Sequence, residues 1–280
     1  MHKYYGWGLP FDNSTHGYSI DRLIYVIHIF MVILFVGWLI FLIYALIKFR
    51  QRPGHKAIYK ENHFKAPTYL EVAVAIFELV LLVGFSFPVV HHVRAMFPPQ
   101  KDAMEIRVVA EQFAWNIHYP GADGVFGKAN LKLLSASNPV GLDRDDPEAQ
   151  DDIVTINQLN IPVHKPVVVK LSTKDVIHSF SLPVMRVKQD VIPGQVIPVW
   201  FEAKETGNFE IACAQLCGLG HYRMRGFFNV QTPEEFSAWL AKNAPKPKPA
   251  PVPAAPPPST TTASLASANP VSTPTPTTGH

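Results

Sequence analysis

The sequence predicts a transmembrane two-helix hairpin, then an all-β domain of Greek-key type, then a disordered tail. Three observations predict this order: two long apolar runs lie near the N-terminus, strand-like runs separated by turn residues follow, and the last residues are rich in proline. We expect four segments, which are an exported N-terminal stretch (1–21), the hairpin (22–95), the β domain with one C-terminal helix (96–244) and the tail (245–280).

The first apolar run, residues 23–47, contains no Asp, Glu, Lys or Arg over 25 positions. At about 1.5 Å per residue, a helix of this length exceeds the roughly 30 Å hydrocarbon core of a bilayer. A cleaved signal peptide is the alternative, but its apolar part is about 7–15 residues long and ends at small residues. Because this run is longer and ends in KFRQR, we expect a transmembrane helix.

A second apolar run, about Tyr69 to Val90, carries Glu71 at its start and Glu78 inside it. A carboxylate at the centre of a membrane helix costs about 2.5–3.5 kcal/mol, so Glu78 is expected to face protein or water. The loop between the two runs contains a single acid and six basic residues, Lys48, Arg50, Arg52, Lys56, Lys60 and Lys65. A short loop this basic predicts a cytoplasmic location, which places both termini and the β domain outside.

Strand-like sequence dominates the exported region. Five runs are rich in β-branched and aromatic residues and are separated by Gly, Pro, Asn and Asp: 104–119, 167–172, 196–203, 208–214 and 226–230. Short strands with long loops indicate a Greek-key sandwich or barrel. One helix is expected after them, because residues 232–235 (TPEE) form a capping box ahead of an apolar face that contains Phe236, Trp239 and Leu240.

The tail, residues 245–280, holds 11 Pro and 11 Ser or Thr, with no aromatic residue and no acid. Such a segment buries too little apolar surface to offset the entropy of ordering it. We therefore expect an extended, disordered tail.

The two cysteines of the chain, Cys213 and Cys217, lie four positions apart, and His221 and Met224 follow them. Thiolate, imidazole and thioether donors form a soft set that suits copper, whereas structural zinc prefers thiolate and imidazole alone. A disulfide between these cysteines would close so short a loop that it would stabilise little. Two thiolates can bridge two metal ions, so the pattern predicts a dinuclear copper site.

A dinuclear site needs a second histidine from elsewhere in the chain. His178 follows a strand-like run and lies 35 residues before Cys213, which suits a neighbouring strand-end loop of a Greek key. A lone histidine is more often a structural residue, so spacing leaves the choice open. The other candidates are His91, His92, His118 and His164.

Three motifs now carry a resemblance: H178-S-F-S-L-P, K188-Q-D-V-I-P-G and C213-A-Q-L-C-G-L-G-H-Y-R-M. Together they resemble subunit II of the cytochrome c oxidases in the haem-copper oxidase superfamily. The resemblance covers roughly residues 20–240, because a two-helix hairpin followed by an exported β domain is also the architecture of that subunit.

The resemblance implies a cupredoxin-like β domain whose loop binds the mixed-valence dinuclear copper centre CuA. It implies two bridging thiolates, two terminal imidazoles, one weak thioether ligand and one main-chain carbonyl ligand, which by position are Cys213 and Cys217, His178 and His221, Met224, and Gln215. It further implies that the centre takes electrons from cytochrome c and passes them to haem in subunit I, where oxygen is reduced to water.

The partners that the resemblance implies are oxidase subunit I and further oxidase subunits, cytochrome c as donor, copper chaperones and membrane lipid, with no nucleic acid. The expected location is a bacterial-type inner (plasma) membrane, with several membrane passes and the copper domain on the periplasmic side. No C-x-x-C-H motif occurs, so we expect no covalent c-type haem on this chain.

The chain departs from the family's pattern at two positions. Gln215 stands where the family usually has a Glu whose carboxylate binds Mg²⁺ at the boundary with subunit I, and a neutral amide is a poorer ligand for this hard cation. In the aromatic stretch 111–119, Phe113 stands at the position of the family's entry-point Trp, and Trp115 is retained. We expect these two residues to mark electron entry; ordinary strand or core packing is the alternative.

Two acidic features admit two interpretations each. Glu71 resembles the family's carboxylate at the mouth of a proton channel, but a solvated acid near a helix start explains it equally well. The stretch 141–152 has six acids and one Arg. Such a stretch is usually a solvated loop; the alternative is electrostatic steering of a basic cytochrome c.

Three other functions remain open at this stage. A quinol oxidase subunit II shares the architecture but lacks the copper ligands. A membrane-anchored copper-delivery protein would share the ligands without the electron transfer. A thiol-disulfide oxidoreductase would use Cys213 and Cys217, but it would leave His178, His221 and Met224 without a role and needs a helix N-terminus at its first cysteine.

Overall fold

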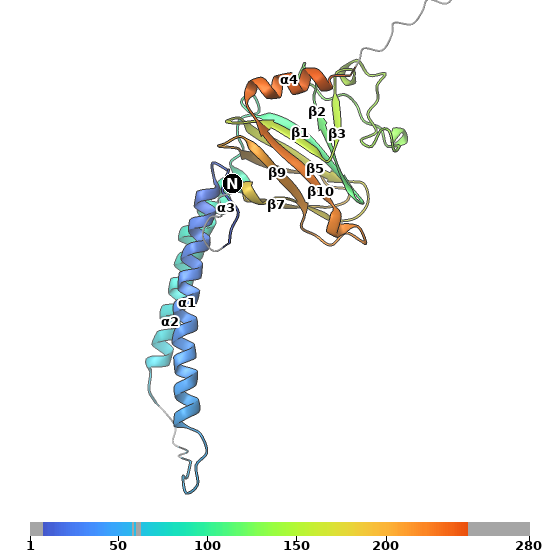
Figure 1. Cartoon of the computed structure of the whole chain (residues 1–280). Coiled ribbons are helices and arrows are strands. Elements are labelled where there is room, and N and C mark those ends of the chain that lie inside the picture. The colour runs from blue at the N-terminus through green and yellow to red at the C-terminus, as the bar shows by residue number, and fades with distance from the viewer. Residues whose placement is uncertain (1–7, 58, 60–62, 246–280) are drawn as a thin grey trace, which may run out of the picture. The chain divides into compact units, whose positions relative to one another are not determined.

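Two long helical segments precede the β domain in the computed structural model, which describes residues 8–57, 59 and 63–245 (Figure 1). Helix α1 spans Gly17–Lys48. The second segment is continuous from α2 (Ala66–Val80) to α3 (Phe87–Ala95). Both segments are long and apolar enough to cross a membrane, with 32 and 30 residues. The two long apolar helices expected from the sequence are thus confirmed, and their crossing of a membrane stays a prediction.

A π-helical turn, Leu81–Ser86, joins α2 to α3. Pro88 explains it, because proline has no N–H to donate and its ring clashes with the carbonyl four residues earlier. The N–H of Phe87 donates to the carbonyl of Leu82, five residues back, which widens the turn ahead of the proline. The second helix therefore continues past a proline that would otherwise break it.

The hairpin helices touch sparingly. Phe30 on α1 and Phe77 on α2 stack with ring centroids 4.4 Å apart. Along Ala66–Ala95, all of which the structure describes, Leu81 is the one buried side chain. Glu71 and Glu78 are both exposed. The expectation that Glu78 meets a polar group of a neighbouring chain therefore stays a prediction.

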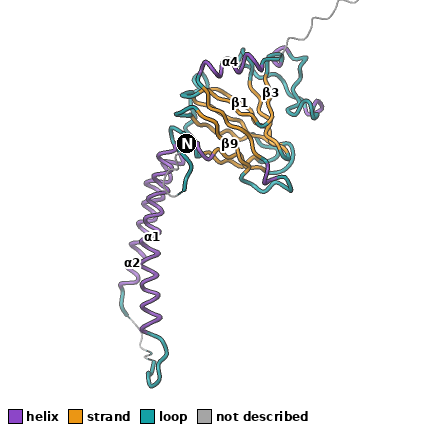
Figure 2. The backbone as a smooth tube through the Cα atoms, viewed as in Figure 1, coloured by secondary structure: helices purple, strands orange, loops and turns teal. Residues whose placement is uncertain are grey.

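The β domain consists of two five-stranded sheets. One has the order β3-β2-β1-β5-β8, with bounds Ile153–Ile156, Ala114–Tyr119, Met104–Glu111, Pro166–Thr173 and Ile197–Glu202. The other has the order β4-β10-β9-β6-β7, with bounds Gln158–Pro162, Arg225–Gln231, Gly207–Cys213, His178–Leu182 and Val187–Val191. The β1–β5 and β4–β10 pairs are parallel and the others are antiparallel. This arrangement fits the expected cupredoxin-like sandwich, and Figure 2 shows the strands gathered in one region, with α4 beside them.

The structure divides the predicted run 104–119 into two strands, β1 and β2, which pair with each other across a turn at Gln112 and Phe113. Four strands were not predicted: β3, β4, β6 and β7. The sequences of β6 and β7, HSFSL and VKQDV, each contain only two apolar residues, too few for a strand pattern to stand out.

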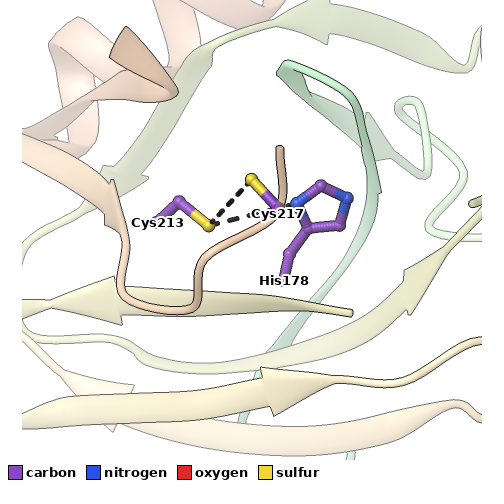
Figure 3. A group of neighbouring side chains, drawn as sticks. All are labelled: His178, Cys213 and Cys217. Atoms are coloured by element: carbon purple, nitrogen blue, oxygen red, sulfur yellow. Dashed lines mark hydrogen bonds between the residues drawn. The ribbon is translucent and has the colours of Figure 1, made fainter. Parts of the chain in front are cut away.

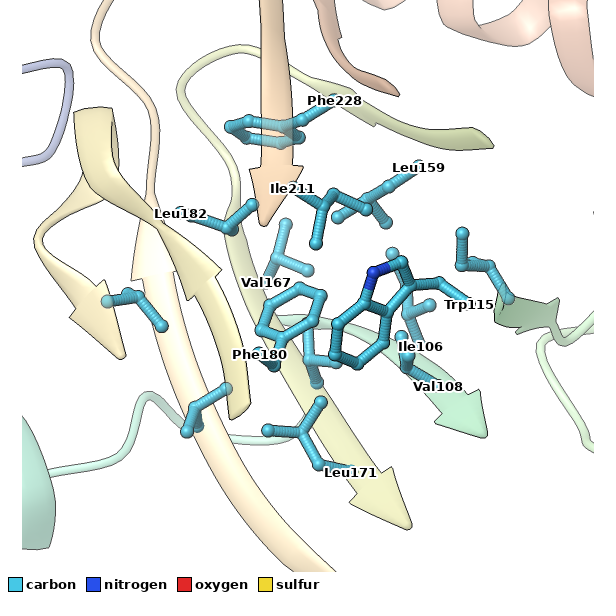
Figure 4. Packing of buried hydrophobic residues seen from close by; sticks show 14 of the residues in the cluster. Ile106, Val108, Trp115, Leu159, Val167, Leu171, Phe180, Leu182, Ile211 and Phe228 are labelled. Carbon is cyan, nitrogen blue, oxygen red and sulfur yellow. The ribbon is translucent and has the colours of Figure 1, made fainter. Parts of the chain in front are cut away.

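The core lies between the sheets. Its largest fully buried side chains include Trp115, Tyr119, Phe180, Phe201 and Phe228. Trp115 and Phe180 come from opposite sheets and meet edge to face, with ring centroids 5.4 Å apart (Figure 4). Aromatic side chains of this size bury about 150–250 Å² each, so these residues dominate the apolar surface that holds the sheets together.

Helix α4, Pro233–Asn243, begins with the capping box expected from the sequence. The Thr232 hydroxyl accepts from the N–H of Glu235, and the Glu235 carboxylate accepts from the N–H of Thr232. Phe236 is buried, and Trp239 packs on Tyr119 of β2 with ring centroids 5.1 Å apart. The helix therefore covers one end of the sandwich. The predicted tail, apart from Pro245, lies outside the described residues.

The residues just before α1 fold against the β domain, which the sequence did not predict. The N–H of Asn13 donates to the carbonyl of Val184 at 2.7 Å, and its side chain donates to the carbonyl of Glu205 at 2.8 Å. Arg186 forms a two-pronged ion pair with Asp21 of α1, at 2.6 and 2.8 Å. Both side chains are buried, so this pair ties the first helix to the sheet domain.

Candidate metal centre

The loop 213–224 leaves the sheet at the end of β9 and returns at the start of β10. The two strands pair up to Ala212 and Arg225, and the N–H of Cys213 donates to the carbonyl of Met224 at 3.2 Å. Inside the loop, His221–Arg223 forms one turn of 3-10 helix. The loop is therefore closed by the sheet itself, which fixes both of its ends.

His178 reaches this loop because β6 lies beside β9. Phe180 pairs with Cys213, and the N–H of Ala214 donates to the carbonyl of Ser179 at 2.9 Å. His178 is the first residue of β6, so its side chain lies at the edge of the sheet where the loop begins. Strand pairing thus brings together residues that are 35 positions apart.

The predicted donors converge at this point, and Figure 3 shows three of them, His178, Cys213 and Cys217. The Sγ atoms of Cys213 and Cys217 lie 3.8 Å apart, and Nδ1 of His178 lies 4.0 Å from Sγ of Cys213. Nδ1 of His221 and Sδ of Met224 lie 3.6 and 3.7 Å from Sγ of Cys217. The main-chain carbonyl of Gln215 lies 3.2 Å from Sγ of Cys213.

These separations fit shared metal ions. For metal–donor bonds of about 2.0–2.3 Å at tetrahedral angles, two donors of one ion lie roughly 3.3–3.8 Å apart. Each thiol is within about this range of three other donors, as a bridging thiolate requires. Among the described residues, the His, Cys and carboxylate atoms close enough to hold one ion together are those of His178, Cys213 and Cys217. His178, Cys217 and Met224 are buried, so three of the six donors are shielded from water.

Asp175 orients His178. Nε2 of His178 lies 2.9 Å from Oδ1 of Asp175, which leaves Nδ1 to face the cysteines. Burial acts to raise the pKa of Asp175, but hydrogen bonds from His178 and from the backbone N–H groups of Gln112 and Val176 outweigh it and lower the pKa. Asp175 is therefore held as a carboxylate, the usual orienting partner of a metal-binding histidine.

The Cys217 thiol keeps its proton without a metal and would lose it when a metal binds. Burial, the adjacent Cys213 thiol and the Asp175 carboxylate together raise its pKa to about 11. A bound metal supplies the positive charge that stabilises the thiolate, and the proton leaves when the metal binds. The arrangement suits a metal ligand and is unfavourable for a nucleophilic thiol.

Phe113 and Trp115, the predicted entry residues, lie at different depths. Trp115 is fully buried, and its ring lies edge-on to His178 with centroids 6.2 Å apart. Phe113 is half-buried at the β1–β2 turn and covers the copper loop: a Cβ added at Gly220 would lie 2.4 Å from its ring. The core-packing alternative therefore describes Trp115, while Phe113 lies over the loop that holds the donors.

The competing histidines lie elsewhere. His118 is buried and its Nε2 lies 2.6 Å from Asp152. His91 and His92 lie on α3, and His164 sits in a turn with φ of 57°. Gln112 was missed by sequence reasoning: its side chain donates to the carbonyl of Cys217 at 2.6 Å, and no motif in the sequence marks it.

The acidic stretch 141–152 is more than a solvated loop, which corrects the simpler interpretation. Asp152 is fully buried, accepts from the N–H groups of two glycines and pairs with His118. Asp146 is nearly buried and accepts from the N–H of Lys128 at 2.8 Å. Asp151 accepts from the N–H groups of Ala122 and Asp123. These three acids anchor the surrounding loops, so electrostatic steering would depend chiefly on the other three.

Known proteins resemble the chain along most of its length. A family model described as "Cytochrome C oxidase subunit II, periplasmic domain" matches residues 104–229. The chain is 36% identical over 207 residues to the alternative cytochrome c oxidase subunit 2 of Bradyrhizobium diazoefficiens, covering 74% of this chain and 73% of that protein. It is 31% identical over 242 residues to cytochrome c oxidase subunit 2 of Cereibacter sphaeroides, covering 81% of this chain and 76% of that protein. A solved periplasmic domain of cytochrome oxidase subunit II from Bradyrhizobium japonicum aligns with a TM-score of 0.39 and 30% identity, over 53% of this chain and 96% of that one.

Proposed function

The chain belongs to the cytochrome c oxidase subunit II family, part of the haem-copper oxidases, and from this premise we propose that its β domain is the electron-accepting module of such an oxidase. It binds CuA, receives electrons from cytochrome c and delivers them to haem in subunit I, which reduces oxygen. The observation that carries the proposal is the convergence of six donors, with neighbouring donors 3.2–4.0 Å apart.

Six residues would hold the centre, through two thiolates, two imidazoles, one thioether and one main-chain carbonyl: Cys213 and Cys217, His178 and His221, Met224, and Gln215. When bound, CuA supplies a one-electron couple whose charge change is spread over two copper ions. Copper is favoured over zinc because a thioether completes the donor set.

The chain's own residues keep these ligands in place. The β9–β10 pairing closes the loop, and Asp175 fixes which nitrogen of His178 faces the thiols. Burial of Cys217 and Met224 keeps water from the donors. Ligands held this way move little between oxidation states, and a small reorganisation favours fast electron transfer.

We place electron entry at Phe113, whose ring covers the donor loop at Gly218 and Gly220. Trp115 lies behind it in the core, against His178. Replacing Phe113 with Leu should slow turnover with cytochrome c and leave the copper spectrum intact. Unchanged turnover would remove Phe113 from the entry route.

Three further proposals come from the family, and they concern a magnesium site, Glu71 and the position of the hairpin in a membrane. A magnesium site at the boundary with subunit I is not expected, because Gln215 presents an amide to it. Glu71 serves the mouth of a proton channel into subunit I. The hairpin lies in a bacterial-type inner membrane, with both termini and the copper domain on the periplasmic side. There it contacts lipid, subunit I and further subunits. Copper chaperones load the metal site.

Two of the alternative functions are disfavoured. A quinol oxidase subunit lacks the copper ligands, whereas all six donors converge here. A thiol-disulfide oxidoreductase needs an activated thiol at a helix N-terminus, whereas Cys213 ends a strand and the pKa of Cys217 is raised. Co-purification distinguishes copper delivery without electron transfer from the proposed function, because an oxidase subunit should purify together with haem-containing subunit I.

The test is electron paramagnetic resonance with copper quantification on the copper-loaded full chain in detergent. We expect about two coppers per chain and hyperfine structure from one electron shared by both nuclei. The variant His118→Asn, which changes a histidine outside the donor group, should give the same spectrum, and Cys217→Ser should abolish it. A single copper with its electron localised on one nucleus would overturn the dinuclear assignment.

A further inference from the structure

The turn between β1 and β2 makes a direct contact with the copper loop. Nε2 of Gln112 donates to the carbonyl of Cys217 at 2.6 Å, although the two residues are 105 positions apart. Cys217 is the donor at the centre of the group, with Cys213, His221 and Met224 around its sulfur. Gln112 therefore holds the backbone of the ligand on which the other loop donors converge.

The same residue also contacts the partner of the histidine ligand. The backbone N–H of Gln112 donates to Oδ2 of Asp175 at 2.7 Å, and Oδ1 of Asp175 accepts from Nε2 of His178 at 2.9 Å. A continuous chain of hydrogen bonds thus runs from His178 through Asp175 and Gln112 to Cys217. Its two ends are metal ligands on different elements, β6 and the loop 213–224.

Asp175 does not depend on Gln112 for its own position. Oδ1 also accepts from the N–H of Val176 at 2.7 Å, and the Thr173 hydroxyl lies 3.2 Å from it. The carboxylate is therefore fixed within its own turn. The side chain of Gln112 is the part of the chain of hydrogen bonds that links this fixed carboxylate to the loop carrying Cys217.

We propose that Gln112 is a positioning residue for the metal centre, which sets the separation of His178 from Cys217 by bonding to Asp175 with its backbone and to the Cys217 carbonyl with its side chain. This inference rests on the proposed copper function. Neither sheet pairing nor the loop's own turn makes this connection: β6 is bonded to the loop's beginning at Ala214, while Cys217 lies three residues further on.

Phe113 strengthens the same contact. A Cβ at Gly218 would lie 2.7 Å from Nε2 of Gln112 and 3.2 Å from the Phe113 ring, so the turn and the loop are in close contact over two residues on each side. Gly218 also has a φ of +128°, a conformation that glycine adopts readily. The loop approaches the turn this closely because it has no side chain there.

The test compares Gln112→Glu and Gln112→Ala with wild type, using the full chain loaded with copper. A glutamate keeps the length of the side chain but offers no N–H to the Cys217 carbonyl, and alanine removes the group. Gln195→Ala, in the exposed β7–β8 turn, is the matched control. The readouts are the copper hyperfine pattern, the reduction potential, the rate of copper loss to a chelator and the unfolding temperature of the copper-free protein.

We expect both Gln112 variants to lose copper about ten-fold faster, the lower end of what outer partners of metal ligands contribute, and to show a changed hyperfine pattern and a shifted potential. The copper-free unfolding temperature should stay within the range of the control. Wild-type hyperfine pattern, potential and copper loss in Gln112→Glu would overturn the positioning role alone. Absence of a shared-electron signal in wild type itself would overturn the proposed function, and this inference with it.

Discussion

The largest aromatic side chains of the β core are enclosed, whereas most aromatic side chains of helix α1 are exposed. Trp115, Phe180 and Phe228 have no accessible surface, while Trp38 and Phe41 on α1 are 62% and 58% exposed. An open apolar groove of about 830 Å³ runs between the two helices near these residues. The β domain therefore supplies its own core, whereas the hairpin leaves a large apolar surface uncovered, as an interaction surface does.

The contacts that join the hairpin to the β domain resemble those of the β core, because they are buried and hydrogen-bonded. Asp21 and Arg186 are buried, and Asn13 is hydrogen-bonded on both sides of its amide. A helix that depends on others for its packing is thus fixed to the domain at one end. Side chains are therefore held in fixed positions mainly in the β domain, which carries the proposed copper donors.

The largest expected effect comes from cutting into the β core. Phe180→Ala should cost about 3–5 kcal/mol of unfolding free energy, because it leaves a cavity against Trp115. The matched change Phe41→Ala in the hairpin should cost less than about 1 kcal/mol in detergent, since that ring is already exposed. Thermal unfolding followed by near-ultraviolet circular dichroism measures both. Equal losses would break the comparison between an enclosed and an open region.

A smaller effect is expected at the join. Arg186→Met leaves the Asp21 carboxylate buried without a partner and should cost about 3 kcal/mol of local stability. The exposed pair Arg225–Glu210, with both side chains more than 60% exposed, is the control, and Arg225→Met should cost less than about 1 kcal/mol. Hydrogen exchange of residues 12–21 reports the loss. Unchanged protection there in Arg186→Met would show that the pair does not hold the helix.

The smallest effect is a pH dependence at His16. Burial, followed by the charge of His92, lowers the pKa of His16 below 6.5, although Asp12 and the Met185 backbone oppose the shift. The released segment therefore binds more protons than the docked one, and docking weakens as the pH falls from 6.5 toward the lowered pKa. Above 6.5 docking is at its full strength.

Protection factors of the amides of residues 13–16, measured by hydrogen exchange at pH 7.5 and pH 5, test this. We expect lower protection at pH 5, and no pH dependence in His16→Phe. Amides of β1 provide the internal control. A wild-type segment equally protected at both values would contradict the prediction.

The clustering of the proposed copper ligands was predictable because their residue types and spacing carry the signal. Cys213, Cys217, His221 and Met224 are close in sequence, so their proximity needs no knowledge of the fold. His178 could be chosen from among five histidines only through the resemblance, since it meets the loop by strand pairing. The helices were predictable for a similar reason, because length and apolar composition define a membrane span.

The features that escaped prediction depend on contacts between distant positions. Gln112 and Cys217 are 105 residues apart, and Asp21 and Arg186 are 165 apart. The division of 104–119 into two strands was also missed, because the turn at Gln112 carries none of the Gly, Pro, Asn or Asp residues that mark hairpins. Strand β6 was not predicted because two of its five residues are serine. The serines fit in the strand because the sheet pairs their backbone groups.

The closure of the donor loop by β9 and β10 has a consequence for engineering. Because the two strands remain paired up to Ala212 and Arg225, the twelve residues between them form an exchangeable cassette whose ends are held by the scaffold. On the proposed function, a transplanted loop must match at least two side chains outside it, the imidazole at position 178 and the amide at position 112. A grafted loop that does not match the amide at position 112 would contain its own ligands but would lack the contact proposed to align them.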